Sequence, residues 1–329
     1  MALREPHRAA HGDVTARELF DVELEGADGP AGRGEAAPLE SHDGVSGDLV
    51  AAALAAHAAA IAALPSDVTG PQILDACRHA ADLPQALAAV DMALWDRAAQ
   101  RAGKPVVALL TDEALEAVEV NATIGALDRG GAADAAAQAA REGFRCVKVK
   151  VGIGDDAGRV AAVRALAGPE IALRLDANGA WTVDEAVRAI GMLAAAGLEL
   201  VEEPVHGIAQ LRAVRERVPV RIAMDETAGE HGALASGAAD AVCLKVSRCG
   251  GISATLAAAA LVRALGGDVY LASNLDGPLG IAAAVHCAAA LRVELPSGLA
   301  TLGQLDLDGD PLPVVAGRIA VPTGPGLLA

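Results

Sequence analysis

Residues 171–204, IALRLDANGAWTVDEAVRAIGMLAAAGLELVEEP, contain one full repeat of the pattern that decides the fold. The apolar run Ile171–Asp176 predicts a buried strand, the alanine-rich stretch Val183–Ala196 predicts a helix, and Leu198–Glu202 predicts the next strand. Apolar strands that alternate with helices are typical of a parallel sheet covered by helices. The repeat therefore indicates an α/β protein.

The same repeat continues in both directions along the chain. The further strand-like runs are Val118–Ile124, Arg145–Val151, Val220–Met224, Ala241–Val246, Asp268–Ala272 and Gly298–Leu302. Eight strands alternating with seven helices predict a closed barrel rather than an open sheet. We therefore expect a (β/α)7β TIM-like barrel over residues 117–305. Gly152-Ile153-Gly154 does not complete a dinucleotide-binding fingerprint.

Residues 1–116 follow a different pattern, which predicts an N-terminal α+β capping domain. Two or three strands are expected, Glu18–Glu25 among them, with a turn at residues 27–30. The expected helices are Asp48–Leu64, Gly70–Ala81 and Pro84–Ala102. A C-terminal tail, residues 306–329, contains two short strand-like runs and is expected to return to the capping domain.

Composition narrows the classes of function. The net charge of −17 argues against binding to nucleic acid or to an anionic membrane surface, both of which need clusters of Lys and Arg. The N-terminus lacks the apolar core of a signal peptide, and the longest alanine-rich stretch is interrupted by His57. Five cysteines without CxxC spacing indicate buried, reduced thiols. We expect a cytoplasmic protein that acts on a small molecule, with homo-oligomer formation left open.

Charged residues occur where five consecutive strands end. Strand two ends Lys148-Val149-Lys150, strand three ends Asp176-Ala177-Asn178, strand four ends Glu202-Glu203-Pro204, strand five ends Asp225-Glu226-Thr227, and strand six ends at Lys245. A single acid at such a position is usually a helix cap or a turn residue. Five matched positions on five consecutive strands are harder to explain in that way, and the carboxyl ends of barrel strands are where active sites lie.

The spacing brings three carboxylates together. Asp176, Glu202 and Asp225 are about one barrel unit apart, so they are expected to converge as hard oxygen ligands, which suits Mg²⁺, with Mn²⁺ as an alternative. Lys148 and Lys150 point the same way, into the barrel, because side chains alternate along a strand. A nearby cation would lower the pKa of these lysines and make them usable as bases near neutral pH. Glu203 and Glu226 are expected to lie behind the ligands or to pair with Lys148.

These motifs resemble the muconate-lactonizing subgroup of the enolase superfamily. The resemblance rests on KVK, LDANGAW, VEEP, MDET and LKVSRCGG in the barrel, and on GRGEAAPLESHDGVS and VDMALWDRAAQRAGKPVVALL before it. It implies that Asp176, Glu202 and Asp225 bind Mg²⁺, that Lys150 and Lys245 are the acid/base pair with Lys148 beside them, and that Asn178 supports the site. It also implies a carboxylate substrate that loses its α-proton to give an enolate.

The subgroup runs several reactions through that enolate, so the specific reaction is harder to predict. The run Gly298–Leu302 resembles some o-succinylbenzoate synthases, and we prefer this dehydration, a step of menaquinone synthesis. Dipeptide epimerase, N-acylamino acid racemase, muconate cycloisomerase and a non-catalytic relic remain alternatives, and Asp306-Leu307-Asp308 resembles the acid pair of dipeptide epimerases. The candidate substrate contacts are Ser273, Asp276, Gly277, Thr301 and His42. Gly277 and Gly280, at a helix N-terminus, would offer backbone N–H groups to a carboxylate.

Overall fold

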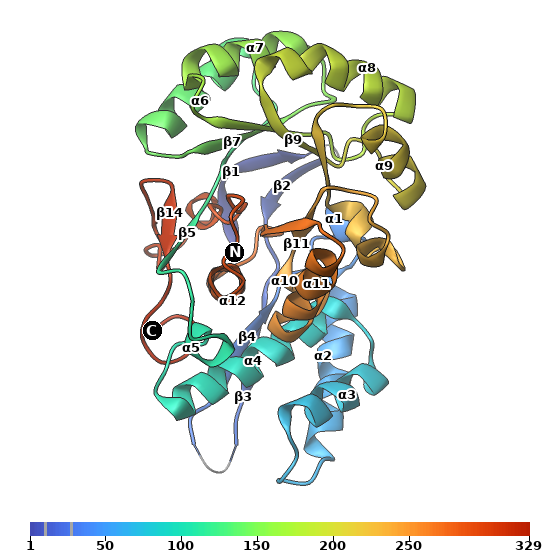
Figure 1. Cartoon of the computed structure of the whole chain (residues 1–329). Coiled ribbons are helices and arrows are strands. Elements are labelled where there is room, and N and C mark those ends of the chain that lie inside the picture. The colour runs from blue at the N-terminus through green and yellow to red at the C-terminus, as the bar shows by residue number, and fades with distance from the viewer. Residues whose placement is uncertain (10–11, 27–28) are drawn as a thin grey trace.

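The N-terminal part of the chain forms an α+β unit. The computed structural model describes residues 1–9, 12–26 and 29–329, so the predicted turn at 27–30 lies partly outside the described residues. Two antiparallel hairpins, β1 (Ala2–Ala9) with β2 (Gly12–Ala16) and β3 (Phe20–Leu24) with β4 (Gly32–Ala36), precede the helices. The helices are α1 (Glu40–Asp43), α2 (Gly47–Ala62), α3 (Gly70–Ala80), α4 (Pro84–Ala102) and α5 (Val107–Leu110). Figure 1 shows α2, α3 and α4 grouped at one end of the molecule.

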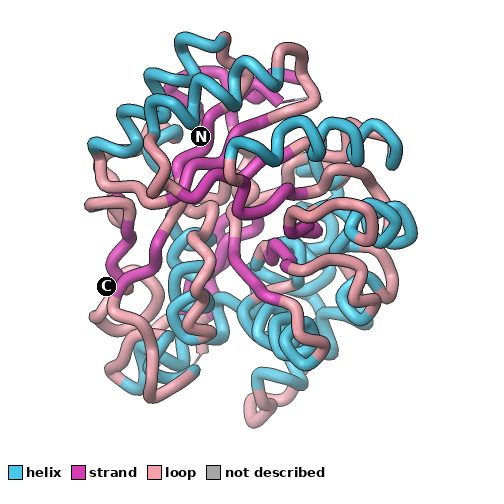
Figure 2. Tube along the Cα trace, turned by 45° about the horizontal axis from the view of Figure 1, so that its top comes forward, coloured by secondary structure: helices cyan, strands magenta, loops and turns pink. Residues whose placement is uncertain are grey.

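The rest of the chain forms a parallel barrel with helices outside it. The strands are β6 (Ala122–Ile124), β7 (Cys146–Lys150), β8 (Ala172–Asp176), β9 (Leu198–Glu202), β10 (Arg221–Met224), β11 (Ala241–Leu244) and β12 (Asp268–Leu271), paired in chain order. The helices are α6 (Arg129–Arg141), α7 (Asp156–Ala167), α8 (Val183–Leu193), α9 (Ile208–Arg215), α10 (Val246–Cys249), α11 (Ile252–Ala264) and α12 (Pro278–Ala290). Figure 2 shows the strands gathered inside a layer of helices. The predicted fold class is confirmed.

The structure corrects the predicted first and eighth strands. The first divides into β5 (Ala117–Glu119) and β6, and β5 pairs instead with the tail strand β14 (Arg318–Ala320), which pairs in turn with β13 (Val314–Val315). The eighth is reduced to two bridges, Ser297 with Val120 and Gly298 with Ala272. It ends there because the chain turns at Thr301, whose N–H bonds to the carbonyl of Leu299, and enters a 3₁₀ turn.

One expected barrel helix is also absent. Between β10 and β11 the described chain forms only two 3₁₀ turns, Glu226–Gly229 and Ala233–Ala235, whereas every other connection between neighbouring barrel strands contains an α-helix. Gly232 and Gly237 adopt left-handed backbone angles, with φ of 79° and 61°, which interrupt any helix in this segment. The prediction of seven helices in regular alternation was therefore wrong at this connection.

The two units and the tail are held together by buried polar contacts. Asp91 on α4 accepts hydrogen bonds from the N–H and the hydroxyl of Ser253 on α11, at 3.0 and 2.6 Å. The tail reaches the N-terminal unit, where the Leu327 N–H donates to Asp96 on α4 at 2.8 Å. The cysteines are free and four of them are buried. Among the described residues, no helix has the length and apolar character needed to span a membrane.

Candidate active site

Three buried carboxylates lie side by side at the carboxyl ends of β8, β9 and β10. Asp176, Glu202 and Asp225 are 1%, 0% and 5% exposed. The parallel register places Asp176 opposite Glu202, and Lys150 opposite Asp176 on the other side. The residues directly before each acid are buried and apolar, Leu175, Val201 and Met224, so burial of the strand end carries the acid into the barrel mouth. The predicted convergence of these residues is thus present in the structure.

Three lysines contact this acid cluster. Lys148 Nζ lies 3.0 Å from Asp176 and 2.9 Å from Glu202, so a single ammonium group connects two of the carboxylates. Lys150 Nζ donates to Asp176 Oδ2 at 2.7 Å, and Lys245 Nζ donates to Asp225 Oδ2 at 2.7 Å. Lys150 and Lys245 thus approach the cluster from opposite sides of the barrel mouth.

Burial and charge pull the pKa values of this cluster in opposite directions. Burial alone would raise the pKa of Asp176 and Asp225, but the lysine ammonium groups beside them lower it below the ordinary value. The pKa of Glu202 is raised by burial and by its two acidic neighbours. Burial alone would lower the pKa of Lys148 and Lys245, yet the carboxylates raise it above the ordinary value. The carboxylates by themselves therefore favour the ammonium forms of Lys148 and Lys245, and the lowered lysine pKa expected beside a bound cation stays a prediction.

Glu203 supports the loop that follows β10. Its carboxylate accepts hydrogen bonds from the N–H groups of Asp225 and Thr227, at 2.8 and 3.0 Å, and contacts His206 Nδ1 at 3.0 Å. Its backbone is left-handed, with φ of 39°. Such a conformation in a non-glycine residue costs on the order of 1–3 kcal/mol and is tolerated where the surroundings hold it. Glu203 therefore fixes the backbone that carries Asp225.

The other two residues expected behind the ligands form a separate link. Asn178 Nδ2 donates to Glu226 Oε1 at 3.0 Å, and Asn178 also contacts Lys150. Of the two alternatives expected for Glu203 and Glu226, a place behind the ligands or a pairing with Lys148, the second is not seen, since Lys148 bonds to Asp176 and Glu202. The reason is geometric: side chains alternate along β9, so Glu202 faces the barrel interior with Lys148, and Glu203 does not.

Several residues of the site were not predicted. Tyr270 on β12 is buried and donates its hydroxyl to Glu202 Oε2 at 2.7 Å. Arg174 lies below the acids with its guanidinium 5.0 Å from the ring of Tyr270. Atoms of Glu202, Asp225 and Cys243 lie within 4.8 Å of one another, but burial raises the pKa of the Cys243 thiol well above its ordinary value, which disfavours the thiolate that metals bind. Strand alternation could have found Tyr270, because it points the same way as Ala272 into the barrel.

A small pocket of about 90 Å³ opens above the acids. Of the candidate substrate contacts, His42, Ser273 and Thr301 line it, and the hydroxyls of Ser273 and Thr301 are 2.8 Å apart. Asp276 is buried outside the lining, with Oδ2 accepting from the Asn274 N–H at 3.2 Å. The Gly277 N–H does bind a carboxylate, but that of Glu35 at 2.6 Å. Neither Asp276 nor Gly277 lines this pocket, and the Gly277 N–H is already bonded to Glu35, so a contact of either residue with substrate stays a prediction.

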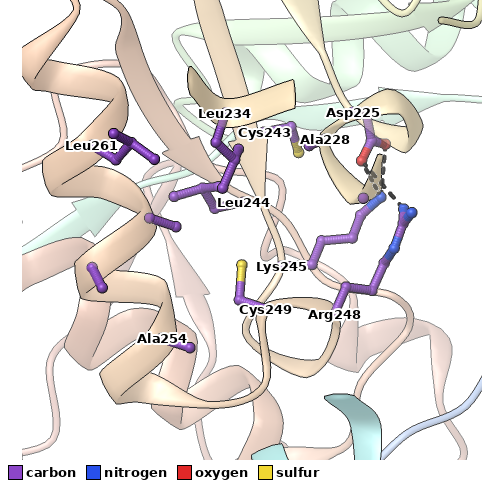
Figure 3. Close-up of a pocket in the computed structure, with 13 residues that line it drawn as sticks. Asp225, Ala228, Leu234, Cys243, Leu244, Lys245, Arg248, Cys249, Ala254 and Leu261 are labelled. Atoms are coloured by element: carbon purple, nitrogen blue, oxygen red, sulfur yellow. Dashed lines mark hydrogen bonds and ion pairs between the residues drawn. The ribbon is translucent and has the colours of Figure 1, made fainter. Parts of the chain in front are cut away.

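A second cavity, of about 440 Å³, lies where the fifth barrel helix is missing. Figure 3 shows Lys245 and Arg248 converging on Asp225, with Leu244 and Cys249 between them and the α11 residues Ala254 and Leu261. Arg248 Nη1 is 3.9 Å from Asp225, and Nη2 donates to the backbone carbonyl of Glu226 at 3.2 Å. The cavity therefore borders Lys245 on the side where that helix is missing.

The fold and the site together define a class of enzyme. A capping unit accompanies a parallel barrel, and the ends of the barrel strands present three acids between lysines. Residues 1–111 match the mandelate racemase / muconate lactonizing enzyme N-terminal domain, and residues 131–328 match the enolase C-terminal domain-like family. The chain belongs to the mandelate racemase / muconate lactonizing enzyme group of the enolase superfamily. It is thus an enzyme of a family that removes a proton next to a carboxylate with the help of Mg²⁺.

The relatives carry out different reactions. The chain is 33% identical to the L-Ala-D/L-Glu epimerase of Bacillus subtilis over 303 residues, 88% of this chain and 82% of the relative. It is 41% identical to the o-succinylbenzoate synthase of Thermobifida fusca over 219 residues, 63% of this chain and 67% of the relative. A dipeptide epimerase from Enterococcus faecalis, solved with Mg and the dipeptide L-Leu-L-Tyr, superposes with a TM-score of 0.90 at 28% identity, covering 99% of this chain and 96% of that chain.

Proposed function

We propose that this enzyme holds Mg²⁺ through Asp176, Glu202 and Asp225 and removes the α-proton of a small carboxylate substrate. The donor chemistry fits: three buried carboxylates at neighbouring strand ends supply hard oxygen atoms, and the same set would accept Mn²⁺. When bound, the metal ion would supply positive charge beside the substrate carboxylate and make its α-hydrogen more acidic. Tyr270 and Glu203 hold Glu202 and the Asp225 backbone in place for this task.

For the reaction itself we favour dehydration to o-succinylbenzoate. Among the residues that the structure describes, the acids lining the small pocket are Asp176, Asp225 and Glu226, so no separate acid pair is present to bind a substrate ammonium group. Asp306 and Asp308, the pair that resembles the epimerase motif, are both exposed and lie outside this lining. The observation that carries the proposal is this shortage of ammonium-binding acids, and the 41% identity to a synthase agrees with it.

One base is sufficient for this dehydration. Lys150 takes the α-proton, and the resulting carbanion electrons form the new double bond as the carbon–oxygen bond of the hydroxyl breaks. Lys150 returns the proton to the departing hydroxide, which leaves as water. Lys245 stays protonated on the opposite side and stabilises the anion by its charge. The product is aromatic, so little substrate-binding energy is needed to drive the step.

Epimerisation of dipeptides is the second candidate. It is supported by the two lysines on opposite sides of the acid cluster, since inversion needs a base on one face and an acid on the other. The similarity to an epimerase over 88% of this chain points the same way.

The test is turnover of the cyclohexadiene carboxylate, followed as loss of its ultraviolet absorbance in the presence of Mg²⁺. We expect turnover that EDTA abolishes and added Mg²⁺ restores. Dipeptides that contain L-Ala are assayed in parallel. Robust epimerisation of a dipeptide without turnover of the diene would replace the synthase assignment with the epimerase one.

A further inference from the structure

The pocket above the acids is built from two segments that are far apart in the sequence. The capping segment, residues 37–45, contributes Leu39 and His42, and the β12–α12 segment, residues 273–277, contributes Ser273, Asn274 and Leu275. The acids and lysines belong to the barrel strands. These two segments line the pocket but supply none of the groups that transfer the proton. How they are held relative to each other therefore affects which substrate fits.

One buried side chain bonds to both segments. Arg17, directly after β2, is 4% exposed. Its Nη1 and Nη2 donate to the carbonyls of Pro38 and Ala37, at 2.6 and 3.1 Å, and its Nε donates to the carbonyl of Leu275 at 3.1 Å. Leu275 has a left-handed backbone, with φ of 55°, so its carbonyl is held in an orientation that this residue type rarely adopts. A guanidinium suits this place because its rigid fork can bond to several carbonyls at once, which an ammonium on a flexible stem cannot do.

Two acids of the capping unit add further links to the same β12–α12 segment. Glu35 accepts from the Gly277 N–H at 2.6 Å, and a β-carbon added to Gly277 would lie 2.3 Å from Glu35 Oε2, so only glycine fits there. Asp43 Oδ2 accepts from the Leu39 N–H at 3.2 Å and lies 3.3 Å from Asn274 Nδ2. The contacts of Arg17, Glu35 and Asp43 thus join the two segments at three points.

The charges in this cluster agree with a fixed arrangement. Burial lowers the pKa of Arg17, and the nearby Asp276, Asp43 and Glu35 oppose that effect. The pKa of Glu35 is raised to about 8 by burial and by Asp276, although the N–H groups of Gly277 and Gly280 lower it. A buried cation surrounded by acids and backbone carbonyls is stable only while all of these partners stay in place.

We propose that Arg17 is a positioning residue that fastens the capping segment to the β12–α12 segment and so sets the substrate specificity of the pocket. The proposal rests on the proposed function only for the identity of the substrate. Arg17 touches no reacting atom, so it acts on substrate binding rather than on proton transfer.

The experiment compares Arg17→Met with a matched control, Arg164→Met. Arg164 on α7 also donates to backbone carbonyls, those of Ala196, Gly168, Ile171 and Gly197, but it does so near the amino ends of β8 and β9. Amide hydrogen exchange is measured on residues 37–45 and 273–281 of each full-length variant. We expect exchange in both segments to become at least about ten-fold faster in Arg17→Met and to stay unchanged in Arg164→Met. Arg17→Lys keeps the charge and serves as a second variant if Arg17→Met does not fold.

Steady-state kinetics give the second measurement. With the substrate that the wild-type enzyme turns over, Arg17→Met should raise KM about ten-fold or more while kcat changes less than about three-fold. Unchanged exchange in both segments, an equal effect of Arg164→Met, or a loss confined to kcat would overturn the proposal. If the wild-type enzyme turns over neither the diene nor the dipeptides, the proposed reaction fails, and the exchange measurement still decides the role of Arg17.

Discussion

Tyr270 donates its hydroxyl to Glu202 Oε2 at 2.7 Å, while both residues are fully buried inside the barrel. Glu202 is the central acid of the three, with Asp176 and Asp225 on either side. The hydrogen bond therefore fixes the orientation of the middle carboxylate from below.

Tyr270→Phe should weaken this orientation without removing a ligand. Substituting a residue that orients a metal ligand typically lowers metal affinity about 10–100-fold, and we expect a loss of Mg²⁺ affinity in this range. Isothermal titration of the variant with Mg²⁺ gives the affinity directly. Unchanged affinity would show that Tyr270 only fills space.

Glu202→Gln should abolish the stabilisation of the protein by Mg²⁺. A ligand at one hundred times its dissociation constant adds about 2.7 kcal/mol to the free energy of unfolding. Thermal unfolding with and without Mg²⁺ measures this gain. Glu199→Gln, on the same strand but beside Arg174 at the other end, is the control and should keep the gain. If Glu202→Gln also keeps it, the ligand assignment is wrong.

Substitutions of Lys245 separate the two candidate reactions. Lys150→Ala should lose about 10²–10⁴-fold in turnover under either, because it removes the base. In the dehydration Lys245 acts by charge alone, so Lys245→Arg should retain more activity than Lys245→Met. In an epimerisation Lys245 must exchange a proton, which arginine does not do at ordinary pH, and both variants should then be equally inactive.

Glu35→Gln should gain stability relative to the wild type as the pH rises. The pKa of Glu35 is about 8 in the folded protein and about 4.5 unfolded, so its favourable contribution is complete below pH 4.5 and is lost as the pH rises through 8. Glutamine keeps the acceptor for Gly277 and does not ionise. The difference in the free energy of unfolding should grow by roughly 4 kcal/mol between pH 5 and pH 9. Denaturant unfolding measures it, with the exposed Glu113→Gln as the matched control.

His286 should make the protein lose stability at acidic pH. Its Nδ1 accepts from the Val107 N–H and its Nε2 donates to the Leu327 carbonyl, so the ring is neutral and holds the tail. Burial lowers its pKa to about 4. Its contribution is present above pH 6.5 and is lost as the pH falls toward 4, by about 3 kcal/mol. His286→Gln should flatten this dependence in unfolding experiments, whereas the exposed His79→Gln should not.

The acids and lysines at the strand ends could be predicted because each is fixed by a local rule. Burial of an apolar strand and the length of one barrel unit are enough to place Asp176, Glu202, Asp225, Lys150 and Lys245 at one mouth. The helices Pro84–Ala102 and Ile252–Leu265 were likewise predicted to within a residue, because their apolar periodicity is local.

The contacts of the pocket wall could not be predicted in the same way. The helix N-terminus at Gly277 led to the expectation that its N–H binds a substrate carboxylate, but not that Glu35, 242 residues earlier, is its partner. Arg17 and Leu275 are separated by 258 residues, and no periodicity connects them. The absence of the fifth helix was also not predicted, because the regular alternation was extended across a segment where Gly232 and Gly237 adopt left-handed angles.

Without an α-helix between β10 and β11, one side of the barrel wall borders a cavity instead of a helix. Lys150 stands on β7, which has the helices α6 and α7 before and after it, whereas Lys245 follows β11, which has a helix only after it and an open cavity on the other side. Segments with little covering structure open at lower free energy than the rest of a fold. We therefore expect the segment that carries Lys245 to open more readily than the strand that carries Lys150.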